Sequence, residues 1–206
     1  MAANVKGIPL KYHYLDMETD EHEKDEYGKI NPSKAIPTLV VEESGKEQFV
    51  LSQSIAIIEY LEERFPDQNP LLPPRDQPEQ RARVRQLQNI ITSDIAPPSN
   101  SRIAFRVRAI RNERDDQFNF VHKVMNEGFT AYEAHLETYG GQYSVGDQLT
   151  IADVCLVPAI DHAKMYRLDL SPYPRITAIY DRLMQLDPIK NGHLKTQEDT
   201  PEQYRN

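Results

Sequence analysis

The spacing of apolar positions changes about a third of the way along the chain. Before residue 65, short apolar runs alternate with helical patterns, and after residue 78 almost every apolar repeat has the spacing of a helix. The stretch between them is rich in proline, which fixes φ and donates no backbone hydrogen bond. We therefore expect an α+β protein with a small α/β domain over 1–65, an extended linker over 66–77 and an all-helical domain over 78–206.

The first domain shows two patterns typical of strands. Leu10–Asp16 alternates and is rich in aromatic residues, which predicts a strand. Apolar runs at Thr38–Val41 and Gln48–Leu51 flank the turn residues Ser44–Gly45, which predicts a β-hairpin. The acidic stretch 18–27 between these strands is expected to be a solvated helix or loop.

Helical patterns surround these strands. Met1–Lys6 followed by Gly7 is typical of the last turn of a helix, and a helix with one apolar face is predicted from Ser54 to Phe65. In the second domain, helices are expected around Val84–Ile91, Phe118–Leu136, Thr150–Tyr166 and Ile176–Leu186, with Pro97–Pro98 stopping or bending the first of them.

The third of these predicted helices is apolar on most sides. It is therefore expected to be the buried central helix of the domain. Thr150-Ile151-Ala152-Asp153 provides a capping box at its start, with a hydroxyl at the N-cap and an acid three residues later.

Composition narrows the classes of function. The 206 residues carry a formal net charge of −8, which disfavours nucleic acid as the main partner. The longest apolar stretches are well short of the ~20 residues that span a bilayer, and no secretory signal is visible. A single cysteine, Cys155, excludes an internal disulfide framework, so a reducing, cytoplasmic setting is the default. The six histidines form no metal-binding pair, so no metal site is expected.

Three features have both a structural and a functional interpretation. Ile36-Pro37 is either an ordinary strand entry or a cis bond that turns the Ile36 backbone toward a ligand. Gln53 and Ser54 either cap a helix or complete a carboxylate pocket at its N-terminus. Five arginines between Arg102 and Arg114 either form a solvated helix face or hold an anionic substrate in a cleft.

Several motifs together resemble the cytosolic glutathione transferases. They are Asn31-Pro32 with Ile36-Pro37-Thr38-Leu39, Gln53-Ser54-x-Ala56-Ile57, the Pro-rich linker, and Gly146-Asp147 with Thr150-Ile151-Ala152-Asp153. The segments 54-SIAIIEYLEE-63 and 152-ADVCLVP-158 are similar to the zeta class, which includes maleylacetoacetate isomerase. The similarity runs from about Gly7 to the end of the chain.

The resemblance implies a thioredoxin-like N-terminal domain, an all-helical C-terminal domain, a homodimer, and glutathione bound between the domains. The glutathione-binding residues that it implies are Ile36, Gln53, Ser54, His22, Asn100, Ser101 and Arg102. In this interpretation the Ile36 backbone pairs with the cysteinyl part of glutathione, while Gln53 and Ser54 hold the γ-glutamyl carboxylate. His22 lies near the glycyl end, and residues 100–102 line the site from the helical domain.

The chain departs from the zeta pattern in three places. Zeta members begin with a strand and a Ser-Ser-Cys-type helix start that stabilises the glutathione thiolate, and these 206 residues show no counterpart. We therefore expect a thioredoxin-like sheet without its first, central strand, no catalytic serine, and a truncated isoform or mis-started product with impaired activity. Met165 stands where many members have an arginine, and Ala96 where some have a glutamine.

The resemblance implies glutathione-dependent isomerisation of maleylacetoacetate to fumarylacetoacetate, a step in phenylalanine and tyrosine breakdown. The substrate is an anionic dicarboxylate, which gives Arg102 or a neighbour a role in binding. A non-catalytic dimerisation or interaction module remains the alternative, because the serine segment is missing. A transferase acting on other small electrophiles is a third reading, since Met165 makes the substrate site more apolar.

Overall fold

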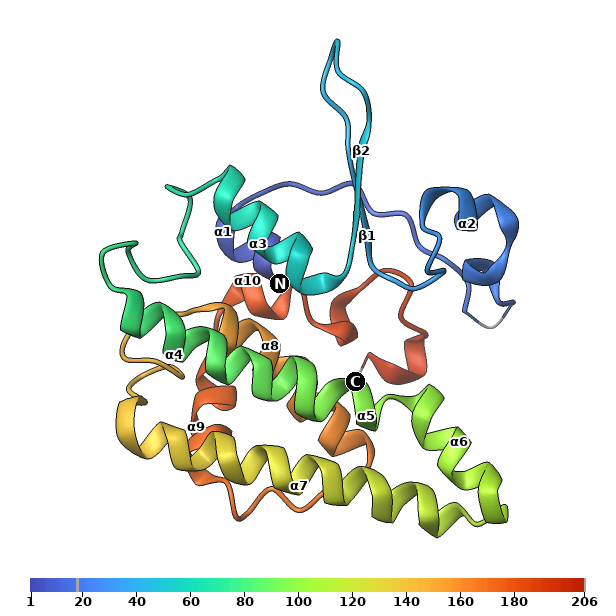
Figure 1. Ribbon diagram of the computed structural model, residues 1–206, viewed down its shortest axis with the longest axis vertical. Coiled ribbons are helices and arrows are strands. Elements are labelled where there is room, and N and C mark those ends of the chain that lie inside the picture. Colours follow the sequence, from blue (N-terminus) through green and yellow to red (C-terminus); the bar gives the residue numbers. More distant parts are fainter. Residues whose placement is uncertain (18, 206) are drawn as a thin grey trace.

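The computed structural model describes residues 1–17 and 19–205, so Glu18 of the acidic stretch lies outside the described residues. A small sheet with short helices stands above a bundle of longer helices (Figure 1). The upper part contains α1 (Ala2–Lys6), η1 (Glu21–Glu23), α2 (Asp25–Ile30), β1 (Thr38–Val41), β2 (Phe49–Ser52) and α3 (Ser54–Arg64). Residues 66–77 then lead into the bundle without forming a helix or strand.

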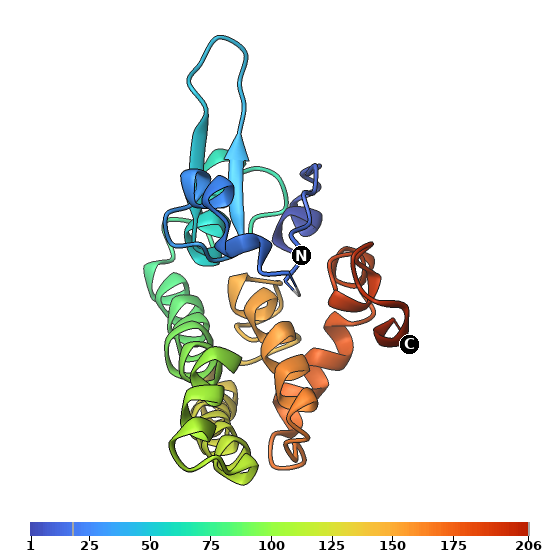
Figure 2. The same ribbon diagram turned by 90° about the vertical axis from the view of Figure 1, so that its right-hand side faces the viewer.

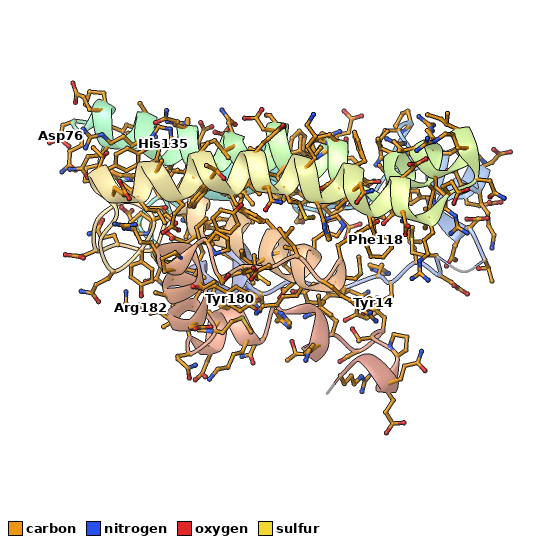
Figure 3. The ribbon with its side chains drawn as sticks, turned by 90° about the horizontal axis from the view of Figure 1, so that it is seen from below. Tyr14, Asp76, Phe118, His135, Tyr180 and Arg182 are labelled. Atoms are coloured by element: carbon orange, nitrogen blue, oxygen red, sulfur yellow. The ribbon has the colours of Figure 1, made fainter. Side chains whose placement is uncertain are left out.

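The bundle is built from the remaining two thirds of the chain. Its elements are α4 (Pro78–Asn89), the π-helix η2 (Ile90–Ile95), α5 (Ala96–Ser99), α6 (Ser101–Arg111), α7 (Arg114–Tyr139), α8 (Ile151–Met165), α9 (Pro174–Leu183), α10 (Asp187–Lys190), η3 (Leu194–Thr196) and η4 (Glu202–Tyr204). Figures 2 and 3 show α8 between the α4–α7 layer and α9. Within the described residues, no helix is long and apolar enough to cross a membrane.

The predicted hairpin is confirmed. Strands β1 and β2 pair antiparallel, with Thr38 opposite Ser52 and Val41 opposite Phe49. The second strand begins one residue later than the pattern indicated. Gly45 has a φ of 78°, in the left-handed region that glycine adopts without a steric cost, so it closes the turn between the strands.

The predicted strand at Leu10–Asp16 is wrong. In the described part of the chain the sheet contains only β1 and β2, and the backbone of residues 10–15 forms no hydrogen bond there. Leu10 and Tyr12 are 38% and 49% exposed. An alternating pattern favours extended backbone, but a strand also needs a hydrogen-bonded neighbour, which the local sequence does not specify.

A buried ion pair ties α1 to α3. The predicted N-terminal helical turn is confirmed, and Gly7 ends it in the left-handed conformation with a φ of 69°. Lys6 Nζ lies 2.7 Å from Glu62 Oε2, and the Lys6 side chain is fully buried. Glu62 also accepts hydrogen bonds from the backbone N–H groups of Leu71 and Leu72, at 3.0 and 3.3 Å. One carboxylate therefore joins two helices to the linker.

The linker is fixed to the helical bundle at the same point. The carbonyl oxygen of Leu71 accepts a hydrogen bond from Ile151 N, the first residue of α8, at 2.9 Å. Leu71 is completely buried. The position of the small sheet above the bundle thus depends on contacts made by Glu62 and Leu71.

Helix α8 is the buried central helix, as predicted. Ten of its residues are buried, and the capping box is present at its start. The Thr150 N–H donates to Asp153 Oδ2 at 2.8 Å, and the Ser144 N–H donates to Asp153 Oδ1 at 2.8 Å. Burial raises the pKa of Asp153 above its ordinary value, although these hydrogen bonds oppose the shift.

The prediction that Pro97 and Pro98 stop or bend the first helix of this domain is confirmed. Helical turns continue from α4 through η2 into α5 and end at Ser99, one residue after Pro98. Proline lacks the N–H group that would continue the helical hydrogen bonds. Gly128 of α7 makes room for η2, since a Cβ atom at this position would lie 2.2 Å from Ile95 Cγ1.

We predict that Glu62→Gln lowers the free energy of unfolding by about 3–5 kcal/mol, because Lys6 would keep a buried charge without a counter-ion. Denaturant unfolding followed by circular dichroism measures the change. The matched control is Glu63→Gln on the exposed side of α3, which we expect to change stability by less than about 0.5 kcal/mol. Equal unfolding midpoints for the two variants would show that the ion pair is not needed.

Candidate functional site

The hairpin register brings two distant segments together. Because Thr38 lies opposite Ser52, the residues just before β1 lie beside those just after β2. A pocket of about 70 Å³ lies there, lined by Ser33, Ala35, Ile36, Pro37, Ser52, Gln53 and Ser54. Three of the residues singled out in the sequence, Ile36, Gln53 and Ser54, therefore meet around one small cavity.

The first wall of the pocket is the bond between Ile36 and Pro37. This peptide bond is cis, the geometry that one of the two interpretations of the sequence expects. The N–H and C=O groups of Ile36 have no hydrogen-bond partner among the described residues, and Ile36 is 55% exposed. A donor and an acceptor on exposed backbone are thus available to an extended peptide ligand.

Asn31 holds this wall in place. Its side chain is buried, and Nδ2 donates to the carbonyl oxygen of Ala35 at 2.6 Å and to Thr38 Oγ1 at 3.0 Å. Its Oδ1 accepts hydrogen bonds from the N–H and the hydroxyl of Ser33, at 3.1 and 2.8 Å. The Tyr27 hydroxyl also donates to Ala35 O at 2.9 Å. These contacts connect both ends of the loop that carries Ile36.

The second wall is the start of α3. Gln53 has a φ of 75° and a ψ of 116°, an unusual conformation for a residue other than glycine. Its carboxamide and the Ser54 hydroxyl have no hydrogen-bond partner in the described part of the chain. The first N–H groups of a helix carry a partial positive charge. A hydroxyl, a carboxamide and helix N–H groups in one place form a suitable site for a carboxylate.

The other expected site residues do not line this pocket. His22 Nε2 lies 3.6 Å from Glu23 Oε1, and its Nδ1 is buried without a hydrogen-bond partner. Asn100 caps α6, its Oδ1 accepting a hydrogen bond from Arg102 N at 2.9 Å. Ser101 is half-buried and Arg102 is exposed. Figure 1 shows α5 and α6 below the base of the hairpin, on the bundle side of the molecule.

Three other features contribute no groups to this pocket. Burial raises the pKa of the Cys155 thiol to about 12, so this cysteine is an inert core residue, as expected. A larger cavity of about 910 Å³ lies between α3, the linker and α4, and it contains none of the predicted site residues. Met165, at the end of α8, is 65% exposed.

Comparisons with known proteins agree with this arrangement. A model of the glutathione S-transferase N-terminal domain matches residues 1–64, and one of the C-terminal domain matches residues 105–192. Maleylacetoacetate isomerase maiA of Aspergillus fumigatus is 39% identical over 206 residues, covering 100% of this chain and 88% of the relative. The chain belongs to the glutathione S-transferase family.

Solved structures of family members have the same fold. The holo structure of a bacterial zeta-class maleyl pyruvate isomerase matches with a TM-score of 0.87 and 36% identity, covering 97% of this chain and 92% of that one. Maleylacetoacetate isomerase from Anaeromyxobacter dehalogenans, solved with dicarboxyethyl glutathione and citrate in the active site, matches with a TM-score of 0.85 and 31% identity. That match covers 100% of this chain and 88% of the other. The thioredoxin-like domain and the helical domain of a glutathione transferase are therefore present.

We predict that Asn31→Ala lowers the free energy of unfolding by about 1–3 kcal/mol, since Ala35 O and the Ser33 groups would lose a buried partner. Amide hydrogen exchange should also speed up in residues 33–38. Asn119→Ala, on the exposed side of α7, is the control and should change neither measurement. If the two variants behaved alike, the Asn31 contacts would not be what holds the loop.

We predict that Cys155 in the folded protein does not react with an aromatic disulfide reagent at pH 8 and reacts fully in denaturant. With a pKa of about 12 the thiol is almost entirely protonated at pH 8, and the side chain is buried. The absorbance of the released thiolate measures the reaction, and Cys155→Ala gives the background. Fast labelling of the native protein would contradict the assignment of Cys155 to the core.

Proposed function

We propose that this protein binds glutathione in the pocket at the base of the hairpin. It uses glutathione to isomerise maleylacetoacetate to fumarylacetoacetate, or to modify other small electrophiles. The observation that carries the proposal is the meeting of Ile36, Gln53 and Ser54 around one pocket. Support for the substrate comes from relatives named maleylacetoacetate isomerase, such as the Aspergillus fumigatus protein, and from a similar structure solved with dicarboxyethyl glutathione.

The pocket offers groups that match a tripeptide with a free carboxylate. The Ile36 N–H and C=O would pair with the backbone of the cysteinyl residue, as one extended strand pairs with another. The Ser54 hydroxyl, the Gln53 carboxamide and the first N–H groups of α3 would hold the γ-glutamyl carboxylate. The lining contains no lysine or arginine, so hydrogen bonds and the helix dipole would provide the attraction.

The remaining predicted residues would complete the site from outside the pocket. His22, with its unpartnered Nδ1, would face the glycyl end of glutathione. Asn100, Ser101 and Arg102 would line the substrate side, and the Arg102 guanidinium would pair with a substrate carboxylate.

When bound, glutathione supplies the thiolate that adds to the cis double bond and leaves after rotation. The residues of this chain would hold that sulfur in position for attack on the double bond. The Ile36 backbone would fix the cysteinyl residue, and the carboxylate site would fix the γ-glutamyl end of glutathione. Arg102 would orient the substrate and stabilise its negative charge.

The resemblance to zeta-class enzymes further supports two statements about the protein's setting. We propose that two copies of the chain form a homodimer and that the protein acts in the cytoplasm, in phenylalanine and tyrosine breakdown. Size-exclusion chromatography with light scattering would measure the mass in solution.

We predict that Ser54→Ala weakens glutathione binding about ten- to hundredfold, because a hydrogen bond to a charged group contributes about 1.5–3 kcal/mol. Isothermal calorimetry measures the affinity, and isomerisation of maleylacetone in the presence of glutathione measures the activity. Ser44→Ala in the exposed hairpin turn is the control and should leave both unchanged. Undiminished affinity in Ser54→Ala would remove Ser54 from the site. Glutathione binding without isomerisation would favour the non-catalytic alternative.

A further inference from the structure

Helix α6 has an unusual charge for this protein. The chain carries eight more acidic than basic residues, yet the 18 residues from Ile95 to Asn112 contain four arginines and no aspartate or glutamate. Only Ala104 of α6 is buried. Its arginines are therefore held at the surface of a molecule whose net charge is negative.

The arginines of α6 differ in their partners. Arg111 pairs with Asp116, whereas the side chains of Arg106 and Arg108 have no ion pair or hydrogen bond among the described residues. Both are exposed. Nothing in the described part of the chain neutralises these two charges.

The position of α6 relates these charges to the site. The helix starts at Ser101, inside the segment 100–102 assigned to the substrate side of the site. With a rise of 1.5 Å per residue, Arg106 and Arg108 lie about 6 and 9 Å along the helix from Arg102. The Debye length is about 8 Å in physiological salt but about 30 Å in dilute salt, so at low ionic strength their field reaches the substrate side without contact.

The surface on the other side of the domain boundary has the opposite charge. Figures 1 and 2 show η1–α2 above α6 on the same side of the molecule. The segment 21–30 contains four carboxylates, Glu21, Glu23, Asp25 and Glu26, and the two lysines Lys24 and Lys29, so its formal net charge is −2. An anion approaching the site from this side therefore meets repulsion along α2 and attraction along α6.

We propose that Arg106 and Arg108 steer anionic substrates carrying two carboxylates into the site, raising their rate of association without touching the bound ligand. The inference rests on the proposed function and deepens it, because it identifies residues outside the site that set how fast the substrate arrives. Electrostatic steering acts on the association rate and falls with ionic strength, whereas a direct contact acts mainly on the dissociation rate.

Stopped-flow binding of dicarboxyethyl glutathione and of glutathione, each at several salt concentrations, tests this proposal. We expect the double variant Arg106→Gln/Arg108→Gln to slow association of the dicarboxyethyl adduct about three- to tenfold at low salt. Its salt dependence should flatten, and the dissociation rate should stay within about twofold. Glutathione, with two fewer carboxylates, should be affected less.

Two matched variants separate local steering from other causes. Arg106→Lys/Arg108→Lys keeps both charges and should retain the fast association. Arg75→Gln/Arg83→Gln removes two exposed arginines that have no ion pair in the described residues, and it changes the net charge equally. Arg75 lies in the linker just before α4, whereas α6 follows α5 at the other end of this helical run. This control pair should leave association unchanged.

Three results would overturn the proposal. They are an unchanged association rate in Arg106→Gln/Arg108→Gln, an equal loss in Arg75→Gln/Arg83→Gln, or an effect confined to the dissociation rate. Glutathione binding to the unmodified protein is measured in the same series. If glutathione itself does not bind, the proposed function is wrong and the steering proposal falls with it. If glutathione binds normally while one of the three results is seen, only the steering proposal is wrong.

Discussion

The carboxylate of Glu62 is the contact on which the arrangement of the two domains depends. It neutralises Lys6 from α1 and accepts the N–H groups of Leu71 and Leu72, and Leu71 in turn accepts from Ile151 at the start of α8. Burying a charged side chain lowers the stability of the fold unless its counter-ion and hydrogen-bond partners are all present. Because its partners come from α1 and the linker, the carboxylate is satisfied only when both are assembled on α3, and the Leu71 carbonyl then connects the linker to α8.

The candidate site follows from a second constraint, the register of one hairpin. Pairing Thr38 with Ser52 determines that Ile36 and Gln53 are neighbours, and a shift of one residue would turn every side chain of the strand to the opposite face. The Asn31 side chain then fixes the loop that approaches β1. Gln53 adopts a left-handed φ between β2 and α3. Such conformations persist when surrounding structure enforces them, and here a strand ends immediately before the residue and a helix begins immediately after it.

The elements that could be predicted from sequence have local causes. Turn residues between two apolar runs defined the hairpin, and the capping box with an apolar run defined α8. The prediction of a strand at Leu10–Asp16 was wrong because the alternating pattern describes one segment and does not specify the neighbouring strand that it must pair with. Asn31 appeared in a motif, but its role was not predicted, since it depends on the loop folding back so that Ala35 and Thr38 reach the same amide. Glu62 was not recognised either, because a glutamate beside Glu63 and Arg64 is typical of a solvated helix end.

The proposed function separates two kinds of anion recognition in this molecule. Within the pocket the lining has no cationic side chain, so a carboxylate would be selected by the direction of short hydrogen bonds, which act only after the ligand has arrived. The uncompensated guanidinium groups lie instead on α6, where their field is weak at any one point but extends across the substrate side. A strong cation inside the pocket would bind any carboxylate in several orientations. With the arginines outside the pocket, electrostatic attraction would act while the substrate approaches. The backbone of Ile36 and the start of α3 would then set the orientation of the bound ligand.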